Sequence, residues 1–489
     1  MAAAKTRMPP ALTLTNAINR GKDQPAPASL PHVDKRAILA IIMMSYIMIV
    51  LDISIVITGL PKIRMELGFS DAGLSWISTA YTLTFGGFLL LGARAGDILG
   101  RRRVFAIGLA IFAIASLFIG FAQTPTTMIA ARAAQGLGSA ILAPSTLALL
   151  QINFPAGPER TRAVAYYAAA AGISASFGLV LGGILADWLS WRVGFFINLP
   201  VALGLIAAAY RFIAETERHG GTFDFAGAVT STLGMTALVF GIVHSAAAGW
   251  ADAATLGAVL SGGVLLAAFV AIEARARQPI MPLRLFRSRE RAGAYLARLL
   301  FLGANVGFFF FATQFMQGVL GYSPALTGLA FLPAMVVNFI VALRVPQLMA
   351  RLGATRLLVA SMIASLLGLL WLSLLPAEAT YWGSLALPML LIGLGQGGAM
   401  APLTQSGIAG VADQDAGAAS GVVNAAHQLG GSLGLAGQVA ASVIASEGLA
   451  GIALLAHRVD NAMLAAAVMV FLALGCVFLL IARRKPSAA

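Results

Sequence analysis

Charged residues are scarce in this chain of 489 residues, and cysteine is almost absent. Only 10% of the residues are Asp, Glu, Lys or Arg, against about 25% in soluble domains. That deficit excludes a soluble multidomain enzyme. The single cysteine, Cys476, excludes a disulfide framework and a cysteine metal site. The sequence also has no phosphate-binding loop, nucleophile triad or metal-ligand cluster, so it predicts no enzyme, no metal and no cofactor.

Long apolar runs stand where a soluble protein would have charge, and hydrophobic residues make up 59% of the chain. Unbroken runs of this length are typical of membrane-spanning helices, because the strands of a membrane barrel alternate between apolar and polar residues. The sequence therefore predicts an all-α membrane protein with 14 transmembrane helices. The predicted spans are 37–60, 73–93, 103–122, 127–150, 162–186, 191–213, 225–245, 253–273, 293–317, 325–345, 355–375, 380–403, 416–445 and 461–482.

The chain has 19 acidic residues and 32 basic ones. In a soluble protein this excess would indicate a nucleic-acid partner, but here the basic residues lie mostly between the apolar runs. With the amino terminus inside, the inner loops and tails hold 26 basic residues and the outer loops hold four. The positive-inside rule then predicts that both termini are cytoplasmic and that the partner of this charge is the lipid bilayer, not nucleic acid.

A faint internal repeat suggests how the predicted spans are grouped. LGFSDAGL at 67–74 resembles LGYSPALTGL at 320–329, and parallel six-helix halves are a known transporter plan. The predicted organisation is a disordered cytoplasmic tail (1–36), a first six-helix bundle (37–213), a connector with two helices and a basic cytoplasmic loop (214–291), a second six-helix bundle (292–482) and a short cytoplasmic tail (483–489).

Asp52 is the only carboxylate near the middle of a predicted span. A charge at that depth costs about 2.5–3.5 kcal/mol on insertion scales, and intramembrane acids usually have a function. Asp52 is therefore expected to exchange a proton against a substrate, while hydrogen bonds to neighbours such as Ser54, or pairing with an arginine, are the structural alternative. Arg132 lies within another span and needs a partner, which Asp52 or a water-filled cavity would provide.

Two further titratable residues within spans are expected to have no functional role. Arg298 is close enough to the inner end of its span to extend its charged group toward water. His427 is flanked by a glycine-rich stretch and is expected to be a packed residue rather than a proton relay.

The short inner loop GARAGDILGRRRV (92–104) permits two interpretations. Its basic run could be orientation charges alone, or Asp97 with Arg101 and Arg102 could form a breakable conformational latch. Glycines in the span 162–186 are expected to allow close helix packing and bending. These glycines are Gly172, Gly178, Gly182 and Gly183. The candidates for contact with a substrate in a central cavity are Tyr81, Gln135, Asn198, Phe308 and Phe311.

Several of these segments resemble the major facilitator superfamily, and specifically its 14-helix drug:proton antiporter branch. The resemblance places the membrane Asp of the branch at Asp52, the loop acid of the superfamily at Asp97 and the fourth-helix arginine at Arg132. The chain departs from the usual motifs at Ile57, Ala93 and Leu179. The similar segments are LDISIVITGLP (51–61), GARAGDILGRRRVF (92–105), RAAQGLGSAILAP (132–144), GISASFGLVLGG (172–183), SWRVGFFINLP (190–200), FDFAG (223–227) and PLRLFRSR (282–289).

The resemblance implies a proton-coupled antiporter in a bacterial inner membrane that exports small lipophilic compounds by alternating access. A monomer would be sufficient for such a cycle. The alternatives are an uptake symporter for a nutrient or organic anion and a non-transporting sensor or scaffold, which would leave Asp52 without a role. Because the spans after residue 292 contain no Asp or Glu at membrane depth, the expected substrates are monovalent cations or neutral compounds, not divalent cations.

Overall fold

The computed structural model describes residues 35–154, 157–216, 223–276, 279–376, 379–411 and 415–482. The two predicted tails lie outside these ranges except for a few residues. No strand occurs in the described residues, and a helix occupies each of the predicted spans. The helices are α1 (Lys35–Leu67), α2 (Trp76–Leu99), α3 (Arg101–Gly120), α4 (Pro125–Asn153), α5 (Pro158–Ile184), α6 (Trp191–Phe196), α7 (Asn198–Phe212), α8 (Phe225–Ala248), α9 (Ala253–Arg275), α10 (Arg289–Gly318), α11 (Pro324–Leu352), α12 (Ala354–Leu372), α13 (Ala386–Gly407), α14 (Ala416–Ser442) and α15 (Gly451–Cys476).

Twelve helical segments within the described ranges are long and apolar enough to cross a membrane. Helices α5 and α14 are not among them, so the number of fourteen spans stays a prediction. Polar side chains such as Asn424, Gln428 and Gln438 lower the hydropathy of α14. Five short helices also occur within the described ranges: η3 (Gly73–Ser75), η4 (Leu185–Leu189), η5 (Leu283–Arg287), η6 (Tyr381–Leu385) and η8 (Val477–Ile481).

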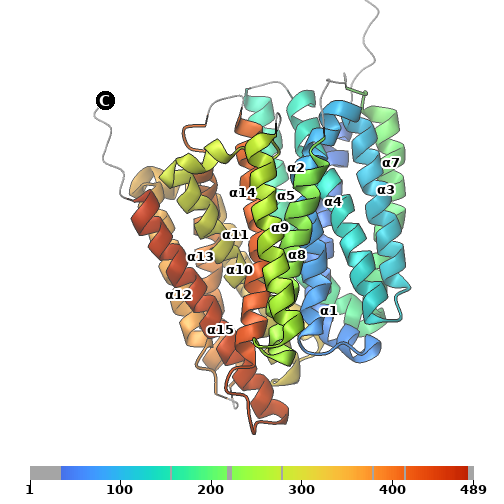
Figure 1. The fold of residues 1–489 in the computed structure, drawn as a ribbon. Helices are drawn as coiled ribbons and strands as arrows, with labels where there is room; N and C mark the ends of the chain where they lie inside the picture. The colour runs from blue at the N-terminus through green and yellow to red at the C-terminus, as the bar shows by residue number, and fades with distance from the viewer. Residues whose placement is uncertain are drawn as a thin grey trace, which may run out of the picture.

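The long helices run up and down through the molecule and are roughly aligned with one another (Figure 1). Helix α1 begins and α15 ends at the same end, which is the upper end in Figure 1 and is called the terminal end below. The opposite end is called the far end. One continuous apolar cluster joins α1 to α10 and α15 and includes Leu60, Phe315 and Val459, so the two halves of the chain share a packed interface.

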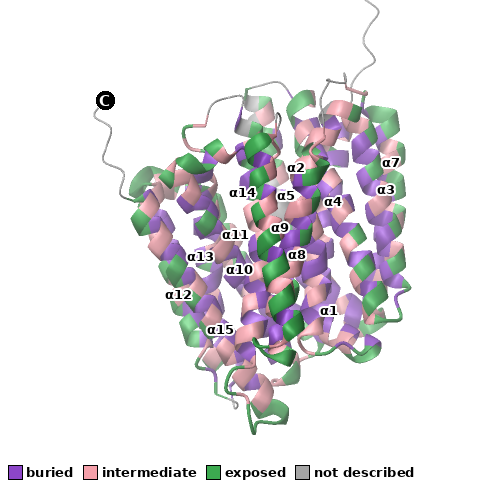
Figure 2. Cartoon of the chain, in the orientation of Figure 1, coloured by how far each residue is buried: buried purple, intermediate pink, exposed green. Residues whose placement is uncertain are grey.

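Helices α8 and α9 pack against each other, and α8 also packs against α2 and α14. Helix α9 lies at the periphery, because only 17% of its span is buried, whereas 78% of the span in α10 is buried. The exposed face of α9 is visible at the front of the molecule (Figure 2). The α8–α9 pair therefore covers the seam between the two halves from one side.

The predicted span 191–213 is helical, and Trp191–Phe212 is long and apolar enough to cross a membrane. The regular helix is interrupted at one residue, Ile197, between α6 and α7, although the backbone there stays in the right-handed helical region. Pro200 explains this break, since it has no N–H with which to bond the carbonyl of Phe196 one turn earlier. The break places Asn198 at the first position of α7, within the protein interior.

Candidate functional site

The carboxylate of Asp52 is fully engaged by side chains from two other helices. Its Oδ2 accepts a hydrogen bond from Nη1 of Arg132 at 2.7 Å. Its Oδ1 accepts from Nε2 of Gln135 at 2.8 Å and from Nδ2 of Asn198 at 2.9 Å. Asp52 and Arg132 are each 1% exposed. The structure therefore seals this ion pair from water in the conformation described, and the partner expected for Arg132 is indeed Asp52.

Helix α4 can bring its polar side chains to Asp52 because it approaches α2 and α3 very closely. Arg132 and Gln135 are three residues apart, and residues with this spacing share one face of a helix. A Cβ atom at Gly138 would lie 2.7 Å from the backbone nitrogen of Phe112 on α3. A Cβ atom at Gly136 would overlap the carbonyl of Tyr81 on α2. Glycine at these positions thus sets the depth at which the arginine meets the carboxylate.

Arg132 has two partners besides the carboxylate of Asp52 and the side-chain amide of Gln135. Its Nε donates to the carbonyl of Ile77 at 2.9 Å, and its guanidinium lies 4.3 Å from the ring centroid of Tyr81. The hydroxyl of Tyr81 is 2.8 Å from Oγ of Ser139. Tyr81 is fully buried, so in this conformation it stacks on Arg132 and does not line an open cavity.

Ser116 on α3 is a member of this network that the sequence analysis missed. Its Oγ accepts from Gln135 at 2.8 Å and from Asn198 at 3.2 Å, and it donates to the carbonyl of Phe112 at 2.7 Å. The only signal in the sequence was a hydroxyl inside the apolar span 103–122. The site is therefore one titratable carboxylate, one fixed cation and a shell of neutral donors from α3, α4 and α7.

The basic loop between α2 and α3 is bound by Glu215, which follows α7. Glu215 accepts from the backbone N–H groups of Arg102 and Arg103 at 3.1 and 3.2 Å, and Arg102 also donates to the carbonyl of Ile213 at 3.1 Å. The acid meets the first N–H groups of α3, where a negative charge is favourable. Gly100 makes room for it, because a Cβ there would lie 2.7 Å from Oε1 of Glu215.

The loop that was expected to act as a latch thus contacts Glu215, a residue that the sequence analysis did not select. The backbone N–H of Arg101 donates to Oγ1 of Thr216 at 3.0 Å, next to that acid. The side chain of Asp97 lies outside the described residues, so its role as a latch stays a prediction.

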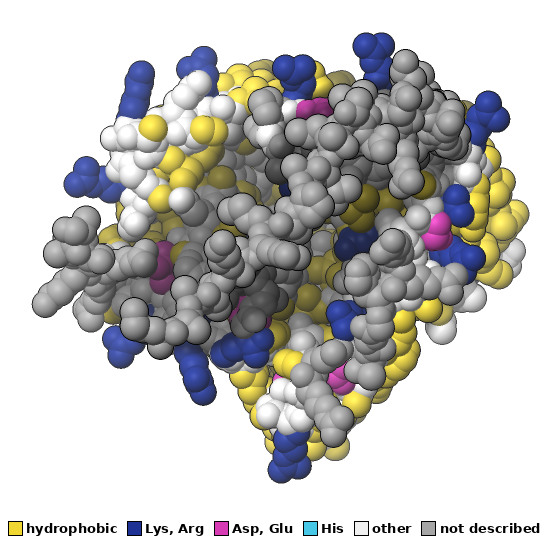
Figure 3. Space-filling model, turned by 90° about the horizontal axis from the view of Figure 1, so that it is seen from above, with side chains coloured by type: hydrophobic (Ala, Val, Ile, Leu, Met, Phe, Trp, Pro, Cys, Tyr) yellow, Lys and Arg dark blue, Asp and Glu magenta, His cyan; other side chains and the backbone are white. Residues whose placement is uncertain are grey.

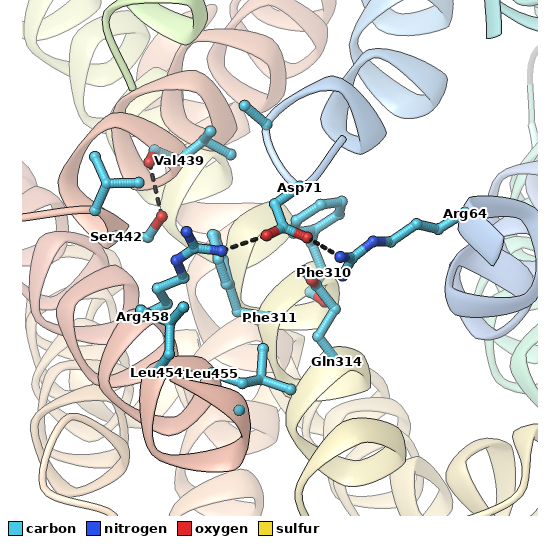
Figure 4. A pocket seen from close by; sticks show the side chains of 13 residues that line it. Arg64, Asp71, Phe310, Phe311, Gln314, Val439, Ser442, Leu454, Leu455 and Arg458 are labelled. Carbon is cyan, nitrogen blue, oxygen red and sulfur yellow. Dashed lines mark hydrogen bonds and ion pairs between the residues drawn. The ribbon is translucent and has the colours of Figure 1, made fainter. Parts of the chain in front are cut away.

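The far end of the molecule carries an ion-pair bridge between the two halves. Asp71 pairs with Arg64 at the end of α1 and with Arg458 on α15 (Figure 4). These residues line a cavity of about 240 Å³ together with Phe311 and Gln314. Phe311, one of the substrate-contact candidates, therefore lies at a cavity, and that cavity is at the far end.

Other contacts also close the far end. Nε2 of Gln317 on α10 donates to the carbonyl of Thr58 on α1 at 2.9 Å. Helix α5 meets α11 so closely that a Cβ atom at Gly183 would overlap the carbonyl oxygen of Pro324, and one at Gly328 would lie 2.5 Å from that of Leu179. Gly183 thus joins the two halves.

The remaining glycines of the α5 motif have a different position. A Cβ atom at Gly178 would lie 2.6 Å from Cβ of Ser54, and one at Gly182 would lie 2.5 Å from Cα of Ile55. These two glycines pack α5 against α1 within the first half. The surroundings of Gly172 lie outside the described residues. Close packing is therefore observed for three of the four glycines, and bending stays a prediction.

Phe308 and Arg298 are both buried. Phe308 is 1% exposed and packs edge-on against Phe331, and its contact with a substrate stays a prediction. Arg298 was expected to extend toward water, and this was wrong. It is 7% exposed and directs its guanidinium at Thr404 and His427 inside the second half. Its burial comes from α13 and α14, which carry these two partners and pack against α10.

Comparison with known proteins identifies the family of this fold. Residues 42–435 match the family model described as Major Facilitator Superfamily. The chain is 42% identical over 398 residues to the cephamycin export protein CmcT of Amycolatopsis lactamdurans, covering 80% of this chain and 82% of that protein. It is 38% identical over 403 residues to the puromycin resistance protein pur8 of Streptomyces alboniger, covering 81% and 80%.

Solved structures agree on the fold. A bacterial homologue of the human lysosomal transporter Spinster, in an inward-facing and unoccupied conformation, superposes with a TM-score of 0.66 at 14% identity. The match covers 92% of this chain and 98% of that chain. At this level of identity the likeness shows the fold alone.

The Asp71 bridge predicts how the far end opens. Asp71→Asn leaves Arg64 and Arg458 as facing like charges, so we expect the far end to open more often. An exposed ion pair contributes up to about 1 kcal/mol, which corresponds to about fivefold in an equilibrium. The measurement is maleimide labelling of Ser442→Cys, a cavity position, in a Cys476→Ser background. Glu447→Gln, at an exposed acid of the far end, is the control. An unchanged labelling rate in Asp71→Asn would show that the bridge does not hold this end closed.

The close approach of α5 and α11 at Gly183 leads to a second prediction, which uses the same labelling measurement. In Gly183→Ala the added methyl group must displace the backbone of α11, so labelling at Ser442→Cys should rise more than in Asp71→Asn. Gly204→Ala on α7 is the matched control, because nothing lies within 4 Å of a Cβ atom there. Equal labelling of the two alanine variants would contradict a role for Gly183 in far-end closure.

Proposed function

The chain belongs to the major facilitator superfamily, and on that premise we propose that it is a proton-coupled antiporter that exports lipophilic drug-like compounds. It is a multi-span membrane protein. Export of drugs is supported by the relatives, whose names describe a cephamycin export protein and a puromycin resistance protein. Proton coupling is supported by one observation above all, which is the sealed Asp52 carboxylate on its network of donors.

The proposed location is a bacterial cytoplasmic membrane, with the terminal end facing the cytoplasm. The distribution of 26 basic residues against four supports this orientation. Lys and Arg side chains also surround the face at the terminal end (Figure 3). In this orientation the Asp71 bridge and the α5–α11 contact close the extracytoplasmic side, and the described conformation is closed toward the outside.

Asp52 is proposed to carry the proton. When ionised, its charge is balanced by Arg132, and the pair is neutral as a whole. When protonated, the carboxyl group no longer balances the arginine, which keeps Gln135 and the carbonyl of Ile77 as partners. The two protonation states thus differ in the net charge of a buried site. Such a difference changes the relative stability of two bundle arrangements, which is what coupling requires.

The energetic scale is adequate for this coupling. A proton that moves inward gains about 2.3 kcal/mol per 100 mV of membrane potential. A few kcal/mol changes a two-state equilibrium from one dominant conformation to the other. Because Asp52 is 1% exposed in the closed-outside conformation, proton exchange is proposed to occur only after the helices around it rearrange.

The test is Asp52→Asn in everted membrane vesicles with an imposed pH gradient. Addition of an exported compound should release protons in vesicles with the unmodified chain and release none in the variant, because the amide keeps the shape but does not titrate. The variant should still be inserted and folded. Asp52→Glu keeps a titratable group that can pair with Arg132, so partial coupling is expected. Proton release by Asp52→Asn equal to that of the unmodified chain would overturn the assignment.

A further inference from the structure

Arg298 is a buried cation that the proposed proton site does not use. It lies nine residues after the start of α10, about 14 Å along the helix at 1.5 Å per residue. Arg298 as a whole is 7% exposed. Within the parts of the chain that the structure describes, it forms no ion pair. This contrasts with Arg132, whose charge is balanced by Asp52 at 2.7 Å.

The neighbours of Arg298 are neutral acceptors from two other helices. Nη1 donates to Oγ1 of Thr404 on α13 at 2.8 Å, and Nη2 lies 3.2 Å from Nδ1 of His427 on α14. Since a guanidinium can only donate, His427 is the acceptor in this contact. The Nε atom is buried and has no hydrogen-bond partner. Part of the fork that normally holds a carboxylate is therefore free.

A row of amide side chains continues from Arg298 toward the far end. Asn305 lies two turns further along α10, on the same face. It accepts a hydrogen bond from Gln396 on α13, which in turn accepts from Asn338 on α11 at 3.3 Å. Gln396 and Asn338 are only half-buried, so this row has an accessible side. It contains donors and no acid.

The internal repeat makes the difference between the halves explicit. Leu67 and Leu320, which begin the two similar segments, are 253 residues apart, and so are Asp52 and Asn305. The second half thus has a neutral amide where the first has its carboxylate. Arg132 has a counter-ion within the protein, whereas Arg298 lacks one among the described residues. Burial of an uncompensated charge costs several kcal/mol, and a bound anion would offset it.

We propose that Arg298 binds the anionic group of the exported compound, so that the carrier takes amphiphilic monoanions such as carboxylates. This inference rests on the proposed export function and names its substrate class. It differs from the monovalent cations or neutral compounds expected from the sequence, because that reasoning counted acids in the second half and took Arg298 to face water. The unpartnered Nε with an adjacent Nη can hold a carboxylate through two parallel hydrogen bonds.

The test compares three compounds that share one aromatic body: 1-pyrenebutyrate, its neutral methyl ester and the corresponding trimethylammonium analogue. Binding to the detergent-solubilised full chain is measured by fluorescence. The unmodified chain should prefer the carboxylate. Arg298→Gln should weaken carboxylate binding at least about tenfold, since hydrogen bonds to charged groups contribute about 1.5–3 kcal/mol, and leave ester binding unchanged. Arg298→Lys should restore part of the affinity, because it keeps the charge but loses the fork.

A second variant covers the case in which loss of the arginine prevents folding. Thr404→Asp places a carboxylate beside the guanidinium, so the protein supplies its own counter-ion. It should fold, lose its preference for pyrenebutyrate and still bind the ester. Unchanged carboxylate affinity in Thr404→Asp and Arg298→Gln, or an equal loss for all three compounds, would overturn the proposal. Binding requires no gradient, so a failure of proton coupling would leave these results intact.

Discussion

A buried carboxylate and guanidinium are stabilised in a membrane bundle when each neutralises the other and the remaining donors and acceptors are satisfied. Asp52 and Arg132 meet this condition through Gln135, Asn198 and Ser116, which lie on three different helices. The network therefore fixes α1, α3, α4 and α7 relative to one another. Movement of these helices relative to one another would break buried hydrogen bonds and leave polar groups unpaired, which is costly.

That interface depends on backbone contact at the far end. Glycine lets α5 approach α11, since a side chain at Gly183 or Gly328 would enter the partner helix. The Asp71 bridge adds charge at the same end. Backbone contacts of this kind form or separate as a whole when rigid halves rotate, and exposed ion pairs hydrate readily once separated. The far end is thus closed by close backbone contact and by ion pairs that cost little free energy to separate. Such a contact can break and re-form in every transport cycle.

The sequence singled out Asp52 and Arg132 because charge inside a span is rare and costly, and the structure pairs these two residues. It could not assign Gln135 and Asn198 to the carboxylate, because that requires knowing which faces of distant helices meet. Glu215 was missed for the same reason. Arg298 was misjudged because the sequence does not show that α13 and α14 pack around its side chain and enclose the guanidinium.

The charge difference between the halves has a consequence for the driving force. If a proton moves inward on Asp52 while a monoanion bound at Arg298 moves outward, both movements carry positive charge inward across the membrane. Each gains about 2.3 kcal/mol per 100 mV, so the potential drives the exchange twice. Protonation of Asp52 adds a positive charge to the protein, and a bound monoanion adds a negative one. Electrostatic attraction alone would therefore favour a protein that holds both. Antiport therefore requires that the conformational change be permitted with either proton or anion bound, but not with both. Asp52 and Arg298, the proposed proton and anion sites, lie in different bundles. The contacts at the interface between the halves must therefore differ in stability between the singly and the doubly occupied protein.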